Sequence, residues 1–195
     1  MKLPTTHHVG NVILTFDRPL TDPGVCMFLI LKEKKNKSDR RRKRKRVGAG
    51  KWSLPGGATE VFDRSQKHAA QRELYEESGD VWRMPLGDLR KVGLLKGMQC
   101  AKRNSVSWED AQLKWIVHVY MTVIPQDLKD LHRLSKGIVD RRWFPLHSLP
   151  YDNMLTPDRT WMPPLFKGEQ HLIEVLFDYQ FEKMIETRLS PRRFS

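Results

Sequence analysis

The stretches Trp52-Ser53-Leu54-Pro55-Gly56-Gly57 and Arg72-Glu73-Leu74-Tyr75-Glu76-Glu77-Ser78-Gly79 decide the fold of this chain. The first has the composition of a strand that ends in a glycine-rich loop. The second closes a predicted helix over residues 65–78, with Ser65 as its N-cap and Gly79 as the glycine after its last turn. The two stretches therefore predict a strand, a glycine-rich loop and a capped helix in immediate succession.

The helix concentrates three glutamates near its end. Glu73 and Glu77 are four residues apart and share one face, with Glu76 beside them. Like charges at this spacing repel, so helix stability does not explain them, and a solvated acidic face is the alternative. Converging carboxylates suit a hard divalent cation such as Mg²⁺ or Mn²⁺. Arg72 is placed to hold Glu76 at the i+4 position.

The segment from Gly57 to Gly79 resembles the Nudix box, the signature of hydrolases that cleave nucleoside diphosphates linked to another moiety. Its second half matches the family pattern at Arg72, Glu73, Leu74, Glu76, Glu77 and Gly79. Its first half is one residue longer than the pattern. Either Arg64 or the adjacent Asp63 stands where the family has its first glutamate, and Asp80 replaces the final aliphatic residue.

This resemblance spans residues 9–189 and implies an α/β Nudix fold, in which a mixed β-sheet lies between helices. It implies one domain over residues 1–195 and a Mg²⁺ cofactor, with Mn²⁺ as the substitute. The implied metal ligands are the Gly56 carbonyl, Glu73, Glu76 and Glu77. Glu76 is either a third carboxylate ligand or the base that takes a proton from water, and Arg72 orients it.

Relatives often add a glutamate shortly before a Trp-Phe pair. Here the pair is Trp143-Phe144, and Asp140 is the only acidic residue near it. A surface salt bridge with Arg141 or Arg142 is the alternative role for Asp140.

A segment near the C-terminus, Pro157-Asp158-Arg159-Thr160-Trp161-Met162-Pro163, is similar to the base-reading segment of the family's oxidised-purine nucleoside triphosphatases. The resemblance implies that Asp158 accepts hydrogen bonds from a purine edge and that Trp161 stacks on the ring. A loop aspartate and a core tryptophan are the alternatives. Ser53 and Gly57 complete the expected substrate-binding set, Ser53 with a shorter reach than the asparagine of the resembled enzymes.

Three functions compete. The first is Mg²⁺-dependent hydrolysis of an oxidised or normal purine nucleoside triphosphate to the monophosphate and pyrophosphate, which is nucleotide-pool sanitation. The second is a Nudix enzyme acting on an RNA cap, a dinucleoside polyphosphate or a diphosphoinositol. The third is a catalytically inactive binding module, motivated by Arg64. Retention of three mutually repelling glutamates favours an active site over the third.

The net charge of +12 is concentrated in one stretch. Residues 32–46 hold eleven Lys or Arg against two acids, which accounts for nine of the twelve charges. The run from Arg40 to Arg46 is uninterrupted and has nothing apolar to bury, so residues 32–47 are expected to be a mobile insertion. The insertion is inert, a nuclear-import signal, or an arm that attracts RNA or another polyanion. Residues 190–195 are expected to be a basic, frayed tail.

Deleting residues 39–46 should leave the fold and the kcat for a small nucleotide nearly unchanged, because such a loop buries nothing. It should also reduce nuclear accumulation in a eukaryotic cell or weaken salt-sensitive RNA binding. Fluorescence imaging and RNA titrations at two salt concentrations measure these effects. If both are unchanged, only the inert insertion remains.

Composition narrows the cellular setting. The chain contains no run of 18 apolar residues, so no membrane span is expected. Cys26 and Cys100 are too few for a disulfide framework and are expected to be thiols. A cytoplasmic or nuclear location follows as the expectation, with a nucleotide as the small-molecule partner.

Periodicity outlines the remaining elements. We expect strands at residues 8–16, 25–31, 91–98, 113–124 and 142–145. A short helix is expected at residues 128–134, and a proline-rich loop at residues 150–164. The apolar spacing over residues 172–185 favours a helix, whereas the family resemblance allows strands there.

Overall fold

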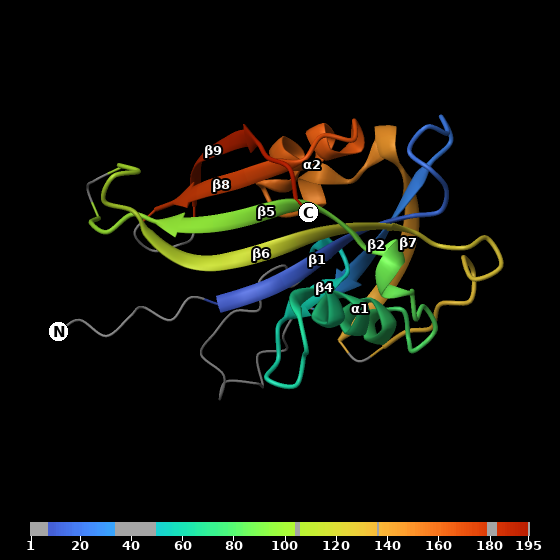
Figure 1. Cartoon of the computed structure of the whole chain (residues 1–195). Helices are drawn as coiled ribbons and strands as arrows, with labels where there is room; N and C mark the ends of the chain where they lie inside the picture. The colour runs from blue at the N-terminus through green and yellow to red at the C-terminus, as the bar shows by residue number, and fades with distance from the viewer. Residues whose placement is uncertain (1–7, 34–49, 104–105, 136, 179–182, 195) are drawn as a thin grey trace.

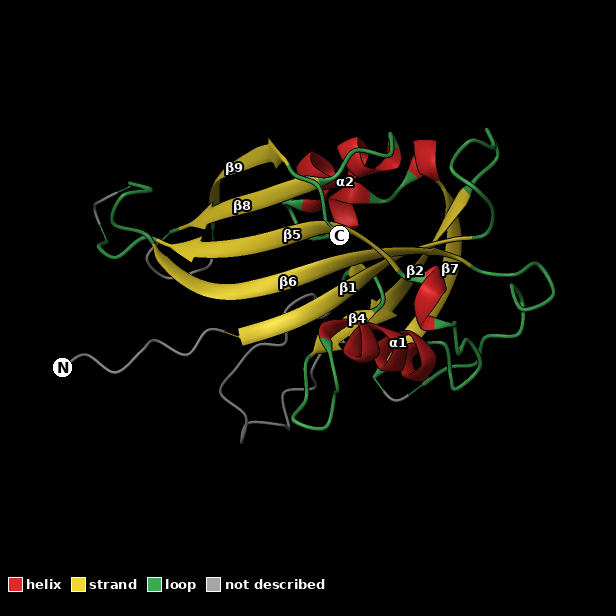
Figure 2. Cartoon of the chain, in the orientation of Figure 1, coloured by secondary structure: helices red, strands yellow, loops and turns green. Residues whose placement is uncertain are grey.

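The computed structural model describes residues 8–33, 50–103, 106–135, 137–178 and 183–194. Within them the chain forms one mixed sheet and two α-helices (Figures 1 and 2). The strands are β1 (His8–Phe16), β2 (Cys26–Lys32), β3 (Trp52–Ser53), β4 (Gly56–Ala58), β5 (Arg90–Gln99), β6 (Gln112–Val123), β7 (Ile138–Pro145), β8 (His171–Phe177) and β9 (Met184–Pro191). The helices are α1 (Gln66–Glu77) and α2 (Asp158–Phe166).

The main path of the sheet runs β3-β2-β1-β6-β5-β8-β9, while β4 pairs with β1 and β7 pairs with β2. The β1–β6 and β5–β8 pairs are parallel, and the other pairs are antiparallel. The short strand β4 carries the glycine pair onto the sheet, where Gly56 lies opposite Val12 and Gly57 opposite Asn11.

The two helices cover opposite faces of the sheet (Figure 1). On one face Ala70 and Leu74 of α1 pack with Ile13, Phe28 and Trp82, and we call this group the α1-side core. On the other face Trp161, Met162 and Leu165 of α2 pack with residues such as Leu14, Met27 and Val119, and this group is the α2-side core. The expected α/β arrangement, a mixed sheet between helices, is confirmed.

Local signals account for the start and end of α1. Ser65 Oγ accepts a hydrogen bond from the backbone N–H of His68 at 3.2 Å, as an N-cap does. Gly79 ends the helix at a φ of 77°, a conformation that glycine adopts without strain. The strand expectations for residues 8–16, 25–31, 91–98 and 113–124 are also confirmed to within one residue.

The expected helix over residues 172–185 is wrong. The region forms β8 and β9, which pair with each other, and β8 continues the sheet in parallel with β5. The apolar residues alternate along β8, so that Ile173 and Val175 are fully buried in the α2-side core. A hairpin that gains an open sheet edge buries these side chains as well as an isolated helix would, and periodicity alone does not separate the two.

The proline-rich segment 150–164 is not an open loop. It forms a short 3₁₀ turn at Tyr151–Asn153 and then most of α2, which contains Pro163 and Pro164. Proline inside a helix removes a backbone hydrogen bond and costs about 3 kcal/mol. Trp161, Met162 and Leu165 are almost fully buried, and their burial offsets that cost.

The expected short helix at residues 128–134 is absent, and the segment consists of turns and irregular backbone. Its backbone groups are used in tertiary contacts. The Leu128 carbonyl accepts the Trp82 indole N–H at 2.7 Å. The Arg133 N–H donates to the Ser78 carbonyl at 2.9 Å, which ties the segment to the end of α1. Strand β7 is longer than expected, starting at Ile138 instead of Arg142.

Most of the basic insertion, including the run from Arg40 to Arg46, lies outside the described residues.

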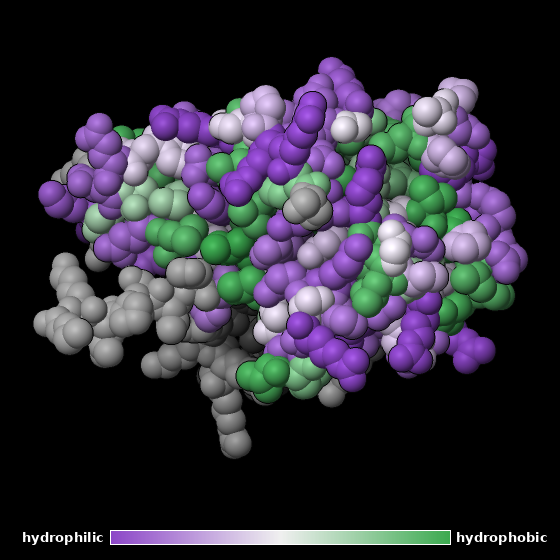
Figure 3. Space-filling model, viewed as in Figure 1, coloured by the Kyte–Doolittle hydropathy of each residue, from purple (hydrophilic) through white to green (hydrophobic). Residues whose placement is uncertain are grey.

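Among the described residues, no helix is long and apolar enough to cross a membrane. Hydrophobic residues on the face seen in Figure 3 lie in small patches separated by polar ones. Cys26 and Cys100 are both free thiols.

Candidate active site at the glycine loop and helix α1

The backbone of the glycine pair lies close to its neighbours on both sides. A Cβ on Gly56 would lie 2.1 Å from the Asn11 carbonyl oxygen, and its φ of 149° also favours glycine. A Cβ on Gly57 would lie 2.5 Å from Cδ of Glu73. The loop therefore contacts β1 on one side and the carboxylate of Glu73 on the other.

Two of the three glutamates face this loop and the third faces solvent. The side chains of Glu73 and Glu77 are 13% and 15% exposed, whereas that of Glu76 is 52% exposed. Glu77 Oε2 accepts the backbone N–H of Gly56 at 2.7 Å, which joins the end of α1 to the loop. The shared face expected for Glu73 and Glu77 is confirmed.

Arg72 connects four groups of the box. Its guanidinium contacts Asp63 at 2.9 Å, Glu73 at 2.8 Å and Glu76 at 3.3 Å, and it donates to the Ala58 carbonyl at 3.0 Å. The expected hold on Glu76 is present, but the contacts with Asp63 and Glu73 are shorter. Arg72 thus fixes the loop and the helix relative to each other.

Asp63 fills the place of the family's first glutamate. It pairs with Arg72, and the hydrogen bond from Arg72 is the main cause that lowers the pKa of its carboxyl. Asp63 also accepts the backbone N–H of Glu60 at 2.8 Å. The extra residue after Gly57 is accommodated in this loop, so Arg64 does not interrupt the network.

Lys32 is a site residue that sequence reasoning did not single out. Its Nζ donates to the Gly56 carbonyl at 3.2 Å and lies 3.4 Å from Glu77 Oε1. It is the first of the eleven basic residues of the insertion, so the charge run concealed it. The apolar run before Lys32 predicts a strand that ends at this residue. That position at a strand end was the only sequence signal for a role of Lys32 in the site.

Arg141 is a second such residue. Only 6% of it is exposed, and its Nε and Nη1 have no hydrogen-bond partner among the described residues. Its Nη2 donates to Ser135 Oγ at 3.1 Å. Burial lowers the pKa of Arg141, and the charge of Glu77 opposes that shift. A buried cation therefore acts on Glu77 from β7, in addition to Lys32 from β2.

Burial dominates the electrostatics of the two inward glutamates. It raises the pKa of Glu73 against the effect of Arg72, and the pKa of Glu77 against the effects of Lys32 and Gly56. The repulsion between neighbouring glutamates adds to both shifts. A buried carboxylate with a raised pKa gains from a further cation nearby.

The donor set fits a hard divalent cation in its chemistry. Carboxylates and a backbone carbonyl are the oxygen ligands that Mg²⁺ and Mn²⁺ prefer. Lys32 already places a positive charge against the Gly56 carbonyl and Glu77. Within the part of the chain that the structure describes, no three His, Cys, Asp or Glu side chains are gathered closely enough to hold a metal ion. The assignment of Gly56, Glu73, Glu76 and Glu77 as ligands thus stays a prediction.

Asp140 forms the surface pair that was its alternative role. Its Oδ2 lies 2.8 Å from Arg142 Nη2, and its Oδ1 accepts the backbone N–H of Arg141 at 2.7 Å. Arg142 is largely exposed. These contacts explain Asp140 without a role at the carboxylates.

The residues predicted to read the base lie on the side of α2. Asp158 begins α2 and is buried, and its Oδ1 accepts the Trp161 indole N–H at 3.1 Å. Burial raises the pKa of Asp158 to about 7. Trp161 is 2% exposed and belongs to the α2-side core. Arg159 points to the surface, where it pairs with Asp152 at 2.6 Å.

One short segment connects the two groups of residues. Lys51 Nζ donates to the Met154 carbonyl at 2.9 Å, and its charge acts on Asp158. Five residues later, Gly56 binds Glu77. Ser53 lies between them, is nearly buried, and donates from Oγ to the Leu54 carbonyl at 3.0 Å. Its predicted substrate contact remains a prediction.

Replacing Gly57 by Ala should lower kcat strongly while changing stability little. The new Cβ would overlap the carboxylate of Glu73, which is the end of a flexible side chain and can move away. Displacing a catalytic group by about 1 Å can cost about a hundredfold in rate. Steady-state kinetics and a thermal melt test this.

The matched control is Gly87→Ala, because a Cβ there meets nothing within 4 Å. It should leave kcat and the melting temperature unchanged. An unchanged kcat in Gly57→Ala would show that the position of Glu73 does not matter for turnover.

Comparisons with known proteins agree with this geometry. A family model described as the NUDIX domain matches residues 21–167, well over half of the chain. The oxidized purine nucleoside triphosphate hydrolase of Danio rerio is 25% identical over 130 residues, which cover 67% of this chain and 72% of that protein.

Solved structures share the fold. The mMutator MutT protein from Bacillus halodurans superimposes with a TM-score of 0.56 at 15% identity, covering 93% of this chain and 97% of its own. A bifunctional NMN adenylyltransferase/ADP ribose pyrophosphatase from Francisella tularensis, complexed with AMP and a Mn ion, gives 0.55 at 18% identity, covering 85% of this chain and 43% of its own. Together with the family match over residues 21–167, the loop, the capped helix and its carboxylates identify this chain as a member of the Nudix family of hydrolases.

Proposed function

We propose that this Nudix hydrolase cleaves a purine nucleoside triphosphate, including oxidised forms, to the monophosphate and pyrophosphate. The observation that carries the proposal is the placement of Glu73 and Glu77 against the Gly56-Gly57 loop, with Arg72 fixing the arrangement. The relative from Danio rerio, named for hydrolysis of oxidised purine nucleoside triphosphates, supports the choice of substrate.

Each residue has a distinct task in this proposal. Glu73, Glu77 and the Gly56 carbonyl would hold Mg²⁺, or Mn²⁺ in its place, with Glu76 as a third carboxylate or as the base. The metal supplies charge neutralisation on the phosphates and lowers the pKa of bound water. Glu76 is the most exposed of the three and is held by Arg72, so it is the carboxylate placed to take a proton from an attacking water.

Recognition of the base is assigned to the α2 side. With a pKa of about 7, Asp158 can accept a hydrogen bond when ionised and donate one when protonated. Trp161 donates its indole N–H to the Asp158 carboxylate, and because only 2% of Trp161 is exposed, its part in substrate binding would be to position Asp158. Ser53 and Gly57 lie on the segment between this aspartate and the glutamates and complete the substrate-binding set.

The inactive binding module is the weaker candidate. The argument for it is Arg64 in the place of a glutamate. Asp63, however, provides a carboxylate that pairs with Arg72, so Arg72 has an acidic partner in this part of the box. The RNA cap, dinucleoside polyphosphate and diphosphoinositol substrates depend on the basic insertion. A nuclear-import receptor or RNA bound through residues 40–46, and the corresponding nuclear or cytoplasmic location, are proposals of the same kind.

A turnover assay separates the candidates. The full chain is incubated with normal and oxidised dGTP, capped RNA, a dinucleoside polyphosphate and a diphosphoinositol, each with Mg²⁺ and with EDTA. Mg²⁺-dependent release of pyrophosphate from the triphosphates, with the highest kcat/KM in the panel, is the expected result. Turnover confined to another substrate, or no turnover at all, would refute the proposal.

A further inference from the structure

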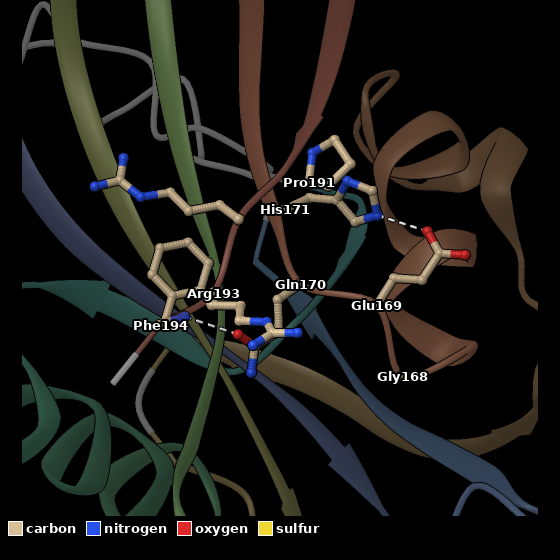
Figure 4. Close-up of a pocket in the computed structure, with 8 residues that line it drawn as sticks. Gly168, Glu169, Gln170, His171, Pro191, Arg193 and Phe194 are labelled. Atoms are coloured by element: carbon tan, nitrogen blue, oxygen red, sulfur yellow. Dashed lines mark hydrogen bonds and ion pairs between the residues drawn. The ribbon is translucent and has the colours of Figure 1, made fainter.

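A cavity lies away from the Nudix box, at the edge of the sheet that β8 and β9 form (Figure 4). Its volume is about 560 Å³, within the range of small-molecule sites. The walls come from the turn after α2 and from the chain that follows β9. They consist of Gly168, Glu169, Gln170, His171, Pro191, Arg192, Arg193 and Phe194.

Positive charge gathers at this cavity. Arg192 and Arg193 are both exposed, and no acid in the described part of the chain pairs with either. Lys91 places its Nζ over the Phe194 ring, 5.0 Å from the centroid, and the Arg192 guanidinium is 5.7 Å from the same centroid. Glu169, the only acid of the lining, lies 2.7 Å from His171 Nε2. Lys91 and Arg192 thus both lie over the Phe194 ring, and Arg193 lines the same cavity.

The like charges are unfavourable without an anion. Burial lowers the pKa of Lys91, and the charge of Arg192 lowers it further. Some other surface arginines have acidic partners, such as Asp152 for Arg159 and Glu186 for Arg188. An anion at the cavity would relieve the repulsion in the same way.

The walls are held in place by hydrogen bonds across the cavity. Gln170 Oε1 accepts the Phe194 N–H at 2.7 Å, and the Gln170 carbonyl accepts the Arg192 N–H at 2.8 Å. With its oxygen engaged, the Gln170 amide keeps Nε2–H groups as donors. In Figure 4 the side chains of Gln170, Arg193 and Phe194 gather on one side, and His171 and Glu169 lie on the other. These bonds hold the backbone of residues 192–194 against the turn after α2.

We propose that this cavity is a second binding site, separate from the Nudix box, for a small phosphate-bearing anion. Guanidinium groups match the geometry of phosphate oxygens and bind them through paired hydrogen bonds. Arg192 and Arg193 supply these groups, Lys91 adds a third positive charge, and Gln170 adds an amide donor. The volume accommodates a free pyrophosphate or a nucleoside monophosphate.

The test is a titration of the ¹⁵N-labelled full chain, followed by NMR in EDTA at constant ionic strength. The probes are pyrophosphate and AMP, with uncharged adenosine as the control ligand. Saturable shifts of the amides of residues 168–171 and 192–194 are expected with pyrophosphate or AMP, and none with adenosine. Binding of both anions assigns recognition to the phosphate, and binding of AMP alone adds a contribution from the nucleoside.

Two double variants make the test specific. Arg192→Gln/Arg193→Gln should weaken binding at this cavity at least tenfold, while its spectrum elsewhere remains that of the wild type. Arg159→Gln/Arg188→Gln removes the same charge from other exposed positions and should change the affinity less than threefold.

Equal weakening in both variants would mean that net charge alone attracts the anion, and the proposal would fall. It would also fall if the shifts were confined to Lys32 and residues 56–77, or if neither anion gave saturable shifts up to about 10 mM, the range of very weak binding. None of these outcomes depends on hydrolysis, so the proposed function is tested separately.

Discussion

Replacing Glu77 by Gln should abolish Mg²⁺-dependent turnover and leave the protein folded. The substitution removes the negative charge beside Gly56 and Lys32 but keeps an oxygen that can accept the Gly56 N–H. We expect kcat to fall at least tenfold, which corresponds to about 1.4 kcal/mol in the barrier. The measurement is kcat at saturating Mg²⁺ on the best substrate of the panel, with Glu174→Gln on β8 as the control. A variant that keeps more than about a tenth of the wild-type kcat would contradict the ligand assignment.

The stability of this variant has a predictable pH dependence. Burial raises the pKa of Glu77 above the ordinary 4.5, so the native state binds this proton more tightly than the unfolded state does. Ionisation therefore costs stability, and the cost grows as pH rises from 4.5 to the folded pKa and stays constant above it. Glu77→Gln avoids that cost, so its melting temperature at neutral pH should equal or exceed that of the wild type.

Thermal melts at two pH values test this sign. The difference in melting temperature between Glu77→Gln and the wild type should shrink well below pH 4.5, where the wild-type carboxyl is protonated in both the folded and the unfolded state. If the variant is instead less stable at neutral pH, the pair with Lys32 outweighs the burial of Glu77.

The parts of this fold that the sequence predicted depend on local interactions. Helix α1 follows from the Ser65 cap, the buried Ala70 and Leu74, and Gly79, all within fifteen residues. The glycine loop is similarly local, because its conformation requires residues without a Cβ. These interactions do not depend on which strand lies beside which, so a one-dimensional pattern contains them.

The parts that could not be predicted depend on distant partners. Strands β8 and β9 are specified by the edge of β5, whose paired residues lie about eighty positions earlier in the chain than those of β8. Helix α2 tolerates two prolines because Trp161 and Leu165 bury against the sheet. In the site, Lys32 and Arg141 act on Glu77 from two different strands. No spacing in the sequence shows that β2 and β7 are neighbours at that point.

The choice between Asp63 and Arg64 shows the same limit within the box. Counting from Gly57 selects Asp63, and counting back from Arg72 selects Arg64. The contact of Arg72 with Asp63 at 2.9 Å decides it, because the loop accommodates the extra residue and keeps the ion pair.

Asp158 should control purine recognition, with an effect that depends on pH. Replacing it by Ala removes an acceptor from a buried site and leaves polar groups unpaired. We expect kcat/KM for purine triphosphates to fall about ten- to a thousandfold, or roughly 1.4–4 kcal/mol. Pyrimidine triphosphates, which lack the matching edge, should change little. Measuring both classes on the wild type and Asp158→Ala makes the comparison, and equal losses would mean that Asp158 supports α2 instead of reading the base.

The pH profile distinguishes recognition from support because the pKa of Asp158 is raised to about 7. If Asp158 accepts hydrogen bonds from a purine edge, its ionised form is the active one, and kcat/KM for purines should rise as pH increases through 7. Asp158→Asn keeps the shape but does not titrate, so this rise should disappear.

The stability of the wild type also depends on this ionisation. Because burial makes the ionised form of Asp158 unfavourable, the free energy of unfolding of the wild type decreases as pH rises from 3.8 to about 7. Asp158→Asn should therefore be at least as stable as wild type at pH 8, and a lost purine preference there cannot come from unfolding. A purine profile that stays the same in Asp158→Asn would assign the ionisation to another group and leave Asp158 as the partner of Trp161 alone.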